Sequence, residues 1–205
     1  MKLIFGTTNK RKIEDLQNII NELNMDIEVL SMEDIGWDRG EIEEDGITIE
    51  ENSLIKAFAI SDFCKDHNLN YPIITDDTGL YVDSLNGEPG IYTVRYADDE
   101  IALNPELPKC QSVIKLYRNL EGKENRDATF RCCVTTMMPD GEFFQEYGES
   151  RGYIKEELPN EFKKPYHYCV FVLKELDKVF NTLTQDELSD TFRYKALRKS
   201  LKKIK

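Results

Sequence analysis

The sequence predicts an α/β fold with a mixed sheet, and three patterns support this prediction. Apolar runs alternate with segments whose apolar residues recur at helical spacing, beginning with the stretch 2–23. A further apolar run, 71–74, follows a second helical pattern. Two strand-like runs, 128–138 and 143–147, then flank the turn Pro139–Glu142, which is typical of a hairpin. Alternating strands and helices favour parallel pairing, and the hairpin adds antiparallel strands, so we expect a mixed sheet flanked by helices.

The first quarter of the chain contains two predicted strands around one helix. A strand at 2–6 leads through a polar turn into a helix at 11–23. Its apolar stripe consists of Ile13, Leu16, Ile19, Ile20 and Leu23. A second strand is expected at 27–30, and the segment 38–46 is too acidic to be core, so it is predicted to be a loop.

Thr48 begins the second predicted helix. Glu51 stands three residues later, which is a capping-box pattern, and the helix should extend to about Lys65. The following strand is expected to end at the adjacent carboxylates Asp76 and Asp77. Neighbouring side chains of a strand point to opposite faces, so these two carboxylates should not share one face.

The rest of the chain is predicted to contain two helices and one further strand besides the hairpin. Glycines and a proline at 87–90 interrupt the chain, and a helix is expected at 106–120. A strand should lie within 168–173, and a final helix should cover 184–204. The sequence shows no internal repeat or linker, so we expect a single domain over residues 1–205.

Composition excludes several classes of protein. The chain has 40% hydrophobic residues and a net charge of −12, which favours a globular protein and argues against a nucleic-acid binder. It lacks an apolar run of about 20 residues, so we expect no membrane span and a cytoplasmic location. Its five cysteines show no metal-ligand spacing and are expected to be free thiols.

The turn between the first strand and the first helix is a candidate phosphate site. It carries Thr7, Asn9 and Lys12, and the backbone N–H groups at a helix N-terminus attract anions. Basic residues are slightly unfavourable at that end of a helix, which favours a ligand there. The alternative is an ordinary N-cap followed by a solvated basic turn.

Acidic residues near the second helix form a candidate metal site. Oxygen ligands from the loop before Thr48, together with Asp77, could hold a Mg²⁺ ion that in turn holds phosphates. Lys56, one turn into the helix, could reach the same phosphates. The alternative is a solvated acidic loop beside an ordinary helix lysine.

Four motifs occur in an order that resembles a known family. They are Thr7-x-Asn9-x-x-Lys12, Glu43-Glu44-Asp45-Gly46-x-Thr48-x-x-Glu51-Asn52-x-x-x-Lys56, Asp76-Asp77-Thr78-Gly79-Leu80 and Gly87-x-Pro89-Gly90-x-Tyr92-x-x-Arg95-Tyr96. The chain is similar to the inosine/xanthosine triphosphate pyrophosphatases, ITPase-like house-cleaning hydrolases of non-standard purine nucleotides. The resemblance is dense over residues 1–97 and continues more thinly through Gly152-Tyr153-Ile154.

The resemblance implies an elongated α/β fold with a curved mixed sheet and a C-terminal helix, usually in a homodimer. It implies Mg²⁺-dependent cleavage of a purine nucleoside triphosphate to the monophosphate and pyrophosphate. Thr7, Asn9, Lys12, Lys56 and Thr78 would then bind substrate. Asp77 would be the general base and a metal ligand with Glu43, and Glu44 is the rival for the role of Glu43.

The last third of the chain departs from the family pattern. The family has Phe-Gly-Tyr/Trp-Asp and Ser-His-Arg in its base pocket, whereas this chain has Tyr166-His167-Tyr168-Cys169 and Thr191-Phe192-Arg193. Tyr168 and Arg193 remain as substrate-binding candidates, for stacking on the base and for reading its carbonyl oxygen. Altered base specificity is therefore expected. The alternatives are a nucleotide-sensing homologue with weak or no turnover and a pyrophosphatase for another modified nucleotide.

Overall fold

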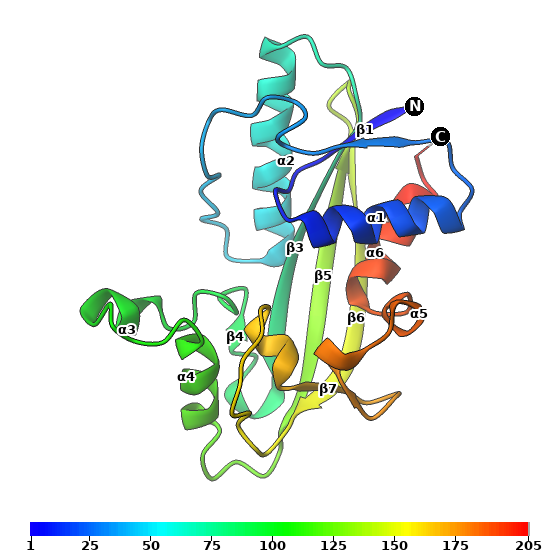
Figure 1. Cartoon of the computed structure of the whole chain (residues 1–205). Coiled ribbons are helices and arrows are strands. Elements are labelled where there is room, and N and C mark those ends of the chain that lie inside the picture. The colour runs from blue at the N-terminus through cyan, green and yellow to red at the C-terminus, as the bar shows by residue number, and fades with distance from the viewer. Residues whose placement is uncertain (205) are drawn as a thin grey trace. The chain divides into compact units, whose positions relative to one another are not determined.

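The computed structural model describes residues 1–204, which form two compact units (Figure 1). Unit 1 contains residues 1–78, 132–148 and the C-terminal segment from Ser189. Unit 2 contains residues 79–131 and 149–188. Three strands have residues in both units, so the chain passes between the units within strands. The expectation of a single domain stays a prediction.

The strands form one mixed sheet in the order β2-β1-β3-β5-β6-β7-β8, with β4 paired to β3. Their bounds are β1 Lys2–Phe5, β2 Glu28–Leu30, β3 Ile73–Val82, β4 Pro89–Gly90, β5 Asp127–Met137, β6 Phe143–Ile154, β7 Phe171–Leu173 and β8 Lys178–Val179. β1 runs parallel to both β2 and β3, whereas β4 is antiparallel to β3 and β7 is antiparallel to β6 and β8. The predicted α/β fold with a mixed sheet is confirmed.

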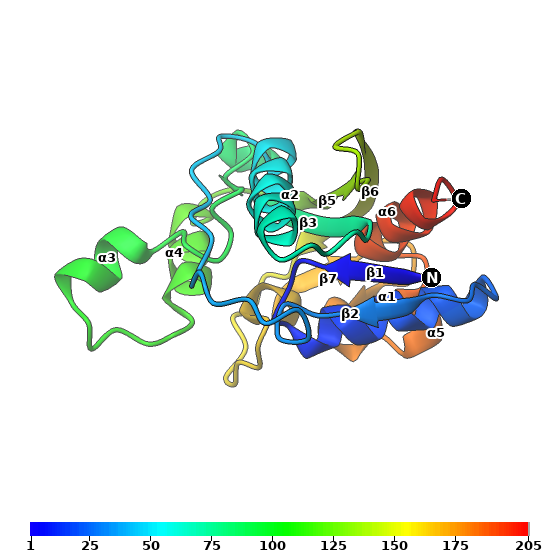
Figure 2. The ribbon, with the colours of Figure 1, turned by 90° about the horizontal axis from the view of Figure 1, so that it is seen from above.

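Three helices cover the strands of unit 1. They are α1 (Lys10–Glu22), α2 (Ile49–Asp66) and α6 (Phe192–Leu201). α2 lies on one face of β3, and α1 and α6 lie together on the other (Figure 2). The expected apolar stripe of α1 is buried at its centre, and α2 packs into an apolar cluster with β1.

A buried polar network joins α2 to the strands. Ser53 Oγ donates to Thr135 Oγ1 at 2.8 Å, and Thr75 Oγ1 donates to the Ser53 carbonyl at 2.6 Å. All three residues are fully buried, so these hydrogen bonds offset the loss of water around their hydroxyls. They fix α2 along β3 just before Asp76.

Unit 2 contains α3 (Asp98–Leu103), α4 (Gln111–Asn119) and the four-residue α5 (Gln185–Leu188). Its core includes an aromatic cluster of Phe130, Phe171, Phe180 and Tyr168. Thr93 Oγ1 accepts from the Leu80 N–H and donates to the Gly90 carbonyl, which fastens the segment after β4 to β3.

The structure corrects three predicted boundaries. β3 does not stop at the two carboxylates but continues to Val82, because each carboxylate finds partners on its own face of the sheet. The helix predicted at 106–120 begins only at Gln111, since Pro105 and Pro108 disfavour a regular helix before it. β6 extends seven residues beyond the predicted end at Tyr147, to Ile154.

The helix predicted at 184–204 is also wrong, because the chain breaks at 189–191 into α5 and α6. Arg198 donates from Nη1 to the Ser189 carbonyl at 3.0 Å, and this bond satisfies a backbone acceptor at the break. The same guanidinium pairs with Glu22 of α1, so the turn is fixed by contacts distant in sequence.

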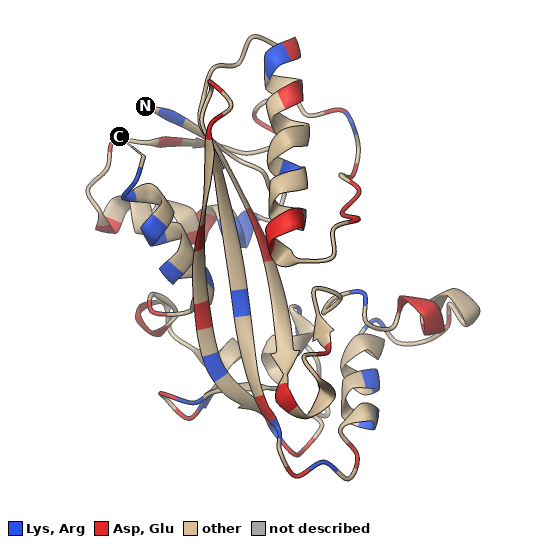
Figure 3. Cartoon of the chain, turned by 180° about the vertical axis from the view of Figure 1, so that it is seen from behind, with Lys and Arg blue, Asp and Glu red and all other residues tan. Residues whose placement is uncertain are grey.

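Charges of both signs are distributed over unit 1 (Figure 3). The α6 ribbon carries basic residues, and the loop before α2 carries acidic ones. Arg193, Lys195 and Arg198 of α6 each take part in an ion pair with a carboxylate of unit 1. Within residues 1–204, every helix is too short or too polar to cross a bilayer. The five cysteines are free thiols, as predicted.

Candidate active site

The turn after β1 is tightly packed and ends in a capped helix. A Cβ atom added at Gly6 would lie 2.4 Å from Ile60 Cδ1 and 2.7 Å from Thr75 Cγ2, so a larger residue there would have to displace these side chains. Thr7 Oγ1 accepts from the Asn9 N–H at 3.1 Å, and Asn9 Oδ1 caps α1 by accepting from the Arg11 N–H at 3.1 Å. The Asn9 side chain therefore holds the helix start in place.

Asp76 is buried on the α1 and α6 side of β3. Lys12 Nζ donates to its Oδ1 at 2.8 Å and Arg193 Nε donates to its Oδ2 at 3.2 Å. Burial raises the pKa of this carboxyl, but the charges of Lys12 and Arg193 outweigh burial and hold the pKa well below its ordinary value. Asp76 therefore stays ionised and ties three elements together.

A second carboxylate, Asp15 of α1, approaches the same arginine. Arg193 Nη1 lies 3.8 Å from Asp15 Oδ2, and the Tyr194 hydroxyl donates to Asp15 Oδ1 at 2.9 Å. Burial raises the pKa of Asp15, and the charge of Arg193 only partly opposes this. Arg193, predicted to read the base, thus lies between two buried carboxylates.

Asp77 points to the opposite face of β3, toward α2. Asn52 Nδ2 donates to its Oδ2 at 3.3 Å, and Lys56 Nζ lies 3.8 Å from its Oδ1. Burial raises the pKa of Asp77 above its ordinary value, and the Lys56 charge opposes this only in part. Two adjacent carboxylates thus have pKa values displaced in opposite directions, a pattern found at acid–base sites.

Lys56 also brings the acidic loop to this site. Its Nζ donates to Glu44 Oε2 at 3.2 Å, and both side chains are largely buried. Glu43, the predicted metal ligand, is exposed, whereas its rival Glu44 lies beside Lys56 and near Asp77. Among residues 1–204 there is no group of three or more His, Cys, Asp or Glu side chains arranged to hold a metal ion.

A pocket of about 220 Å³ lies at the turn after β1. Its lining includes Thr7, Lys12, Glu44, Lys56 and Asp76. The structure therefore gathers the predicted phosphate ligands Thr7, Lys12 and Lys56 around one cavity. Asp77 is not in the lining and is linked to it through Lys56.

The remaining predicted residues lie elsewhere. The Thr78 hydroxyl, directly after Asp77, is buried. Tyr168 belongs to unit 2, where its ring packs edge-on against Phe130 and tilts onto Phe180. This is the contact pattern of a core aromatic residue.

Two residues of this region, Asn52 and Asp76, were not among the predicted site residues. Asn52 is 1% exposed and bonds to Asp77, and Asp76 anchors Lys12. The signal for Asn52 was a polar side chain in the first turn of a helix at a position that faces the sheet. The signal for Asp76 was the alternation of side chains along a strand, which directs Asp76 to the face opposite Asp77.

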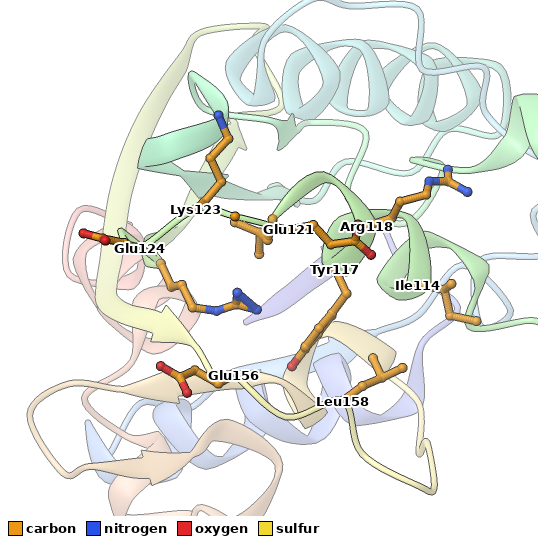
Figure 4. Close-up of a pocket in the computed structure, with 11 residues that line it drawn as sticks. Ile114, Tyr117, Arg118, Glu121, Lys123, Glu124, Glu156 and Leu158 are labelled. Carbon is orange, nitrogen blue, oxygen red and sulfur yellow. The ribbon is translucent and has the colours of Figure 1, made fainter.

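Unit 2 contains a second, larger pocket of about 880 Å³ beside α4 (Figure 4). None of the predicted site residues lines it. Its charged lining is balanced, with three cations and three carboxylates, namely Arg118, Lys123 and Arg126 and Glu121, Glu124 and Glu156. In Figure 4 the Lys123 and Glu124 side chains extend away from Tyr117 rather than converging on it. The smaller pocket of unit 1 is therefore the candidate active site.

Comparison with known proteins identifies the family of this chain. A sequence profile of the Ham1 family matches residues 3–203. The dITP/XTP pyrophosphatase of Bacillus subtilis is 34% identical over 90% of this chain and 86% of its own length. The dITP/XTP pyrophosphatase of Clostridium perfringens is 33% identical over 91% of this chain and 88% of its own length.

Solved structures show the same similarity. The Staphylococcus aureus Ham1 protein superposes with a TM-score of 0.77 at 29% identity, and all of both chains is covered. A HAM1 protein from Coxiella burnetii has a TM-score of 0.78 at 22% identity, covering 98% of this chain and 96% of its own, and supports the fold alone. The family recognised from the sequence motifs is confirmed, and the chain belongs to the Ham1 family.

Proposed function

We propose that this protein is a Mg²⁺-dependent pyrophosphatase that converts purine nucleoside triphosphates of the deoxyinosine and xanthosine type to the monophosphate and pyrophosphate. That the chain is an enzyme, a hydrolase acting on phosphoanhydride bonds, follows from its family and from its dITP/XTP pyrophosphatase relatives. The observation that carries the proposal is the pocket where two lysines meet the acidic loop beside Asp77.

The phosphates would bind at the start of α1 and at the two lysines. The first turn of α1 carries Lys10, Arg11 and Lys12 and no carboxylate, so the positive end of the helix is available to an anion. Lys12 and Lys56 both line the pocket. Lys12 pairs with Asp76 and Lys56 pairs with Glu44. These carboxylates hold the two ammonium groups in position, and a triphosphate would compete with them for the same groups.

The carboxylates near Lys56 supply oxygen atoms, the type of ligand that Mg²⁺ takes in proteins. Glu44 and Asp77 both place an oxygen within 4 Å of Lys56 Nζ, at 3.2 Å and 3.8 Å, so they already converge on one cation. Mg²⁺ is commonly held by one or two carboxylates, together with waters and substrate phosphates. We propose Glu44, rather than Glu43, as the companion of Asp77. A bound Mg²⁺ would supply charge neutralisation on the phosphate oxygens.

Asp77 is proposed to accept a proton from the attacking water. Its pKa is raised by burial, which moves it toward the range in which a carboxylate is an efficient base at neutral pH. Asp76 cannot fill this role, because both of its oxygens accept hydrogen bonds from cationic side chains. The bond between the α- and β-phosphates would then break, with pyrophosphate as the leaving group.

Base recognition is the part of the site that differs from the family pattern. Arg193 and Tyr168 are the residues proposed to contact the base. Arg193 would have to leave or share its contacts with Asp76 to donate to a base carbonyl. We therefore expect weak discrimination between bases, because the family's aspartate and histidine are absent.

A panel of nucleoside triphosphates tests this function. Purified protein should release pyrophosphate from deoxyinosine and xanthosine triphosphates only when Mg²⁺ is present, with lower kcat/KM for adenosine and guanosine triphosphates. The ratio of kcat/KM between the two classes of nucleotide should be smaller than roughly 10⁴, the selectivity that a site with paired polar groups can reach. Binding without turnover would identify a sensing homologue, and turnover confined to another nucleotide would identify a different substrate.

Lys12→Ala should weaken triphosphate binding far more than nucleoside binding, because the ammonium group interacts with phosphate and not with the base. Calorimetric titration with a nucleoside and its triphosphate measures both. Lys10→Ala is the matched control, since Lys10 occupies the same turn but is exposed and does not line the pocket. Equal losses for nucleoside and triphosphate in Lys12→Ala would contradict the assignment.

The homodimer and the cytoplasmic location also belong to the proposal. Both rest on the resemblance to the family.

A further inference from the structure

Asn52 makes two hydrogen bonds that connect the acidic loop to Asp77. Its Oδ1 accepts from the Gly46 N–H at 2.9 Å, and its Nδ2 donates to Asp77 Oδ2 at 3.3 Å. The residue is 1% exposed, so water does not compete for either group. Both ends of the amide are thus committed, one to the loop that carries Glu44 and one to the proposed general base.

The backbone dictates the orientation of this amide. A flipped amide would place its NH₂ against the Gly46 N–H and its oxygen against the Asp77 carboxylate, so both contacts would become repulsive. Gly46 allows the close approach, because a Cβ atom there would lie 2.7 Å from Asn52 Oδ1. Asn52 itself is fixed in the first turn of α2, which Thr48 caps by accepting from the Glu51 N–H.

The orientation of Asp77 follows from this arrangement. Asn52 holds one oxygen of the carboxylate, Oδ2, and the other, Oδ1, is directed to Lys56 at 3.8 Å. A carboxylate that accepts a proton must present a defined lone pair, and partners of this kind set that geometry. If Asp77 could rotate freely, its proton-accepting oxygen would no longer be held in one orientation.

We infer that Asn52 is a positioning residue for the reaction: it fixes which oxygen of Asp77 faces Lys56 and ties that carboxylate to the loop bearing Glu44. This inference rests on the proposed function. It predicts that loss of the Asn52 donor lowers kcat, whereas loss of the loop contact alone does not.

Glu51 provides a matched control. Its Oε2 accepts from the Ile47 N–H at 2.7 Å, so it holds the same loop one residue further along. Within the described part of the chain, the exposed Glu51 carboxylate bonds to the loop and not to Asp77, Lys56 or Glu44. Asn52 and Glu51 thus share the loop contact, and only Asn52 adds the bond to Asp77.

The experiment compares three variants in the full chain with Mg²⁺ and the best substrate of the panel. Asn52→Asp keeps an acceptor for the Gly46 N–H and replaces the donor to Asp77 with a carboxylate oxygen, which also adds a like charge beside Asp77. Asn52→Leu removes both groups, and Glu51→Ala removes only a loop contact. We expect both Asn52 variants to lower kcat by about 10- to 100-fold, the usual effect of residues that orient a ligand or base, with KM changed less than about threefold. Glu51→Ala should lower Tm and leave kcat within about threefold of wild type.

Several outcomes would overturn the inference. Wild-type kcat in Asn52→Asp would show that the donor is dispensable. An equal fall of kcat in Glu51→Ala would assign the effect to the loop, and a change in KM alone would assign it to substrate binding.

A crystal structure of Asn52→Leu gives a readout that does not depend on activity. We expect the Asp77 carboxylate to rotate away from its present orientation, and an unchanged carboxylate would reject the positioning role. If the leucine variant does not fold, Asn52→Asp, which is nearly the same shape, serves for the same measurement. Failure of the wild type to hydrolyse any member of the panel would instead overturn the proposed function, so the two failures are distinguishable.

Discussion

Asp77→Asn should abolish most turnover and leave the fold intact. Loss of a positioned general base lowers the rate by roughly 10²- to 10⁴-fold, and nucleotide binding should survive in part because Lys12 and the α1 N-terminus remain. Burial raises the pKa of Asp77, so its ionised form is disfavoured in the folded protein. A neutral asparagine should therefore keep or raise the free energy of unfolding at neutral pH.

Pyrophosphate release and urea unfolding at pH 7 measure the two effects separately. Asp62→Asn is the control, since Asp62 is an exposed carboxylate of α2 that pairs only with Lys65 among the contacts described. Its turnover and stability should match the wild type within error. Near wild-type pyrophosphate release by Asp77→Asn would remove this carboxylate from the mechanism.

The sequence allowed the opposite roles of Asp76 and Asp77 to be anticipated in part. Alternation along a strand predicts that neighbours face opposite sides, and the structure places one aspartate against α1 and α6 and the other against α2. The strand was nevertheless predicted to end there, because paired carboxylates are rare inside a sheet. The cations beside them come from positions 12 and 193 for Asp76 and from position 56 for Asp77, which local patterns do not connect to the strand.

Other features depended on contacts that no local pattern contains. Glu43 and Glu44 are adjacent in an irregular loop, where no periodicity says which one turns inward, and the partner Lys56 decides it. The stripe of the last helix continues smoothly through 184–204, yet the helix breaks at 189–191, where Arg198 from the next helix satisfies the Ser189 carbonyl. The packing of Tyr168 into an aromatic cluster also depends on residues distant in sequence, and its role in stacking on the base stays a prediction.

Asp76 and Asp77 are therefore adjacent residues with separable contributions. The partners of Asp76 are cations that stabilise its charge, and its removal should affect folding first. The surroundings of Asp77 oppose its charge, and its removal should affect chemistry first. This separation of stability from activity is common where a site maintains a group in an unfavourable state.

Asp76→Asn should lower the free energy of unfolding by about 3–5 kcal/mol, the range for removing one partner of a buried ion pair. The Asp76 side chain is 1% exposed, and Lys12 and Arg193, which bond to it, are 22% and 12% exposed. Asparagine offers one neutral acceptor in place of two charged oxygens, so Lys12 and Arg193 both lose the counter-charge of Asp76. Urea unfolding at pH 7 measures the loss, and Asp62→Asn, which breaks an exposed pair, should cost less than about 1 kcal/mol.

The pH dependence of this difference identifies its cause. The pKa of Asp76 is lowered in the folded state, so the unfolded protein binds its proton more readily. The stability contributed by Asp76 is therefore fully present above the unfolded pKa of about 3.9 and is lost as pH falls below it toward the folded pKa. We expect the wild type and Asp76→Asn to differ by a constant amount between about pH 7 and pH 5 and to converge only in stronger acid. A difference that shrinks already near neutral pH, or one no larger than that of Asp62→Asn, would mean that Lys12 and Arg193 do not stabilise the fold through this carboxylate.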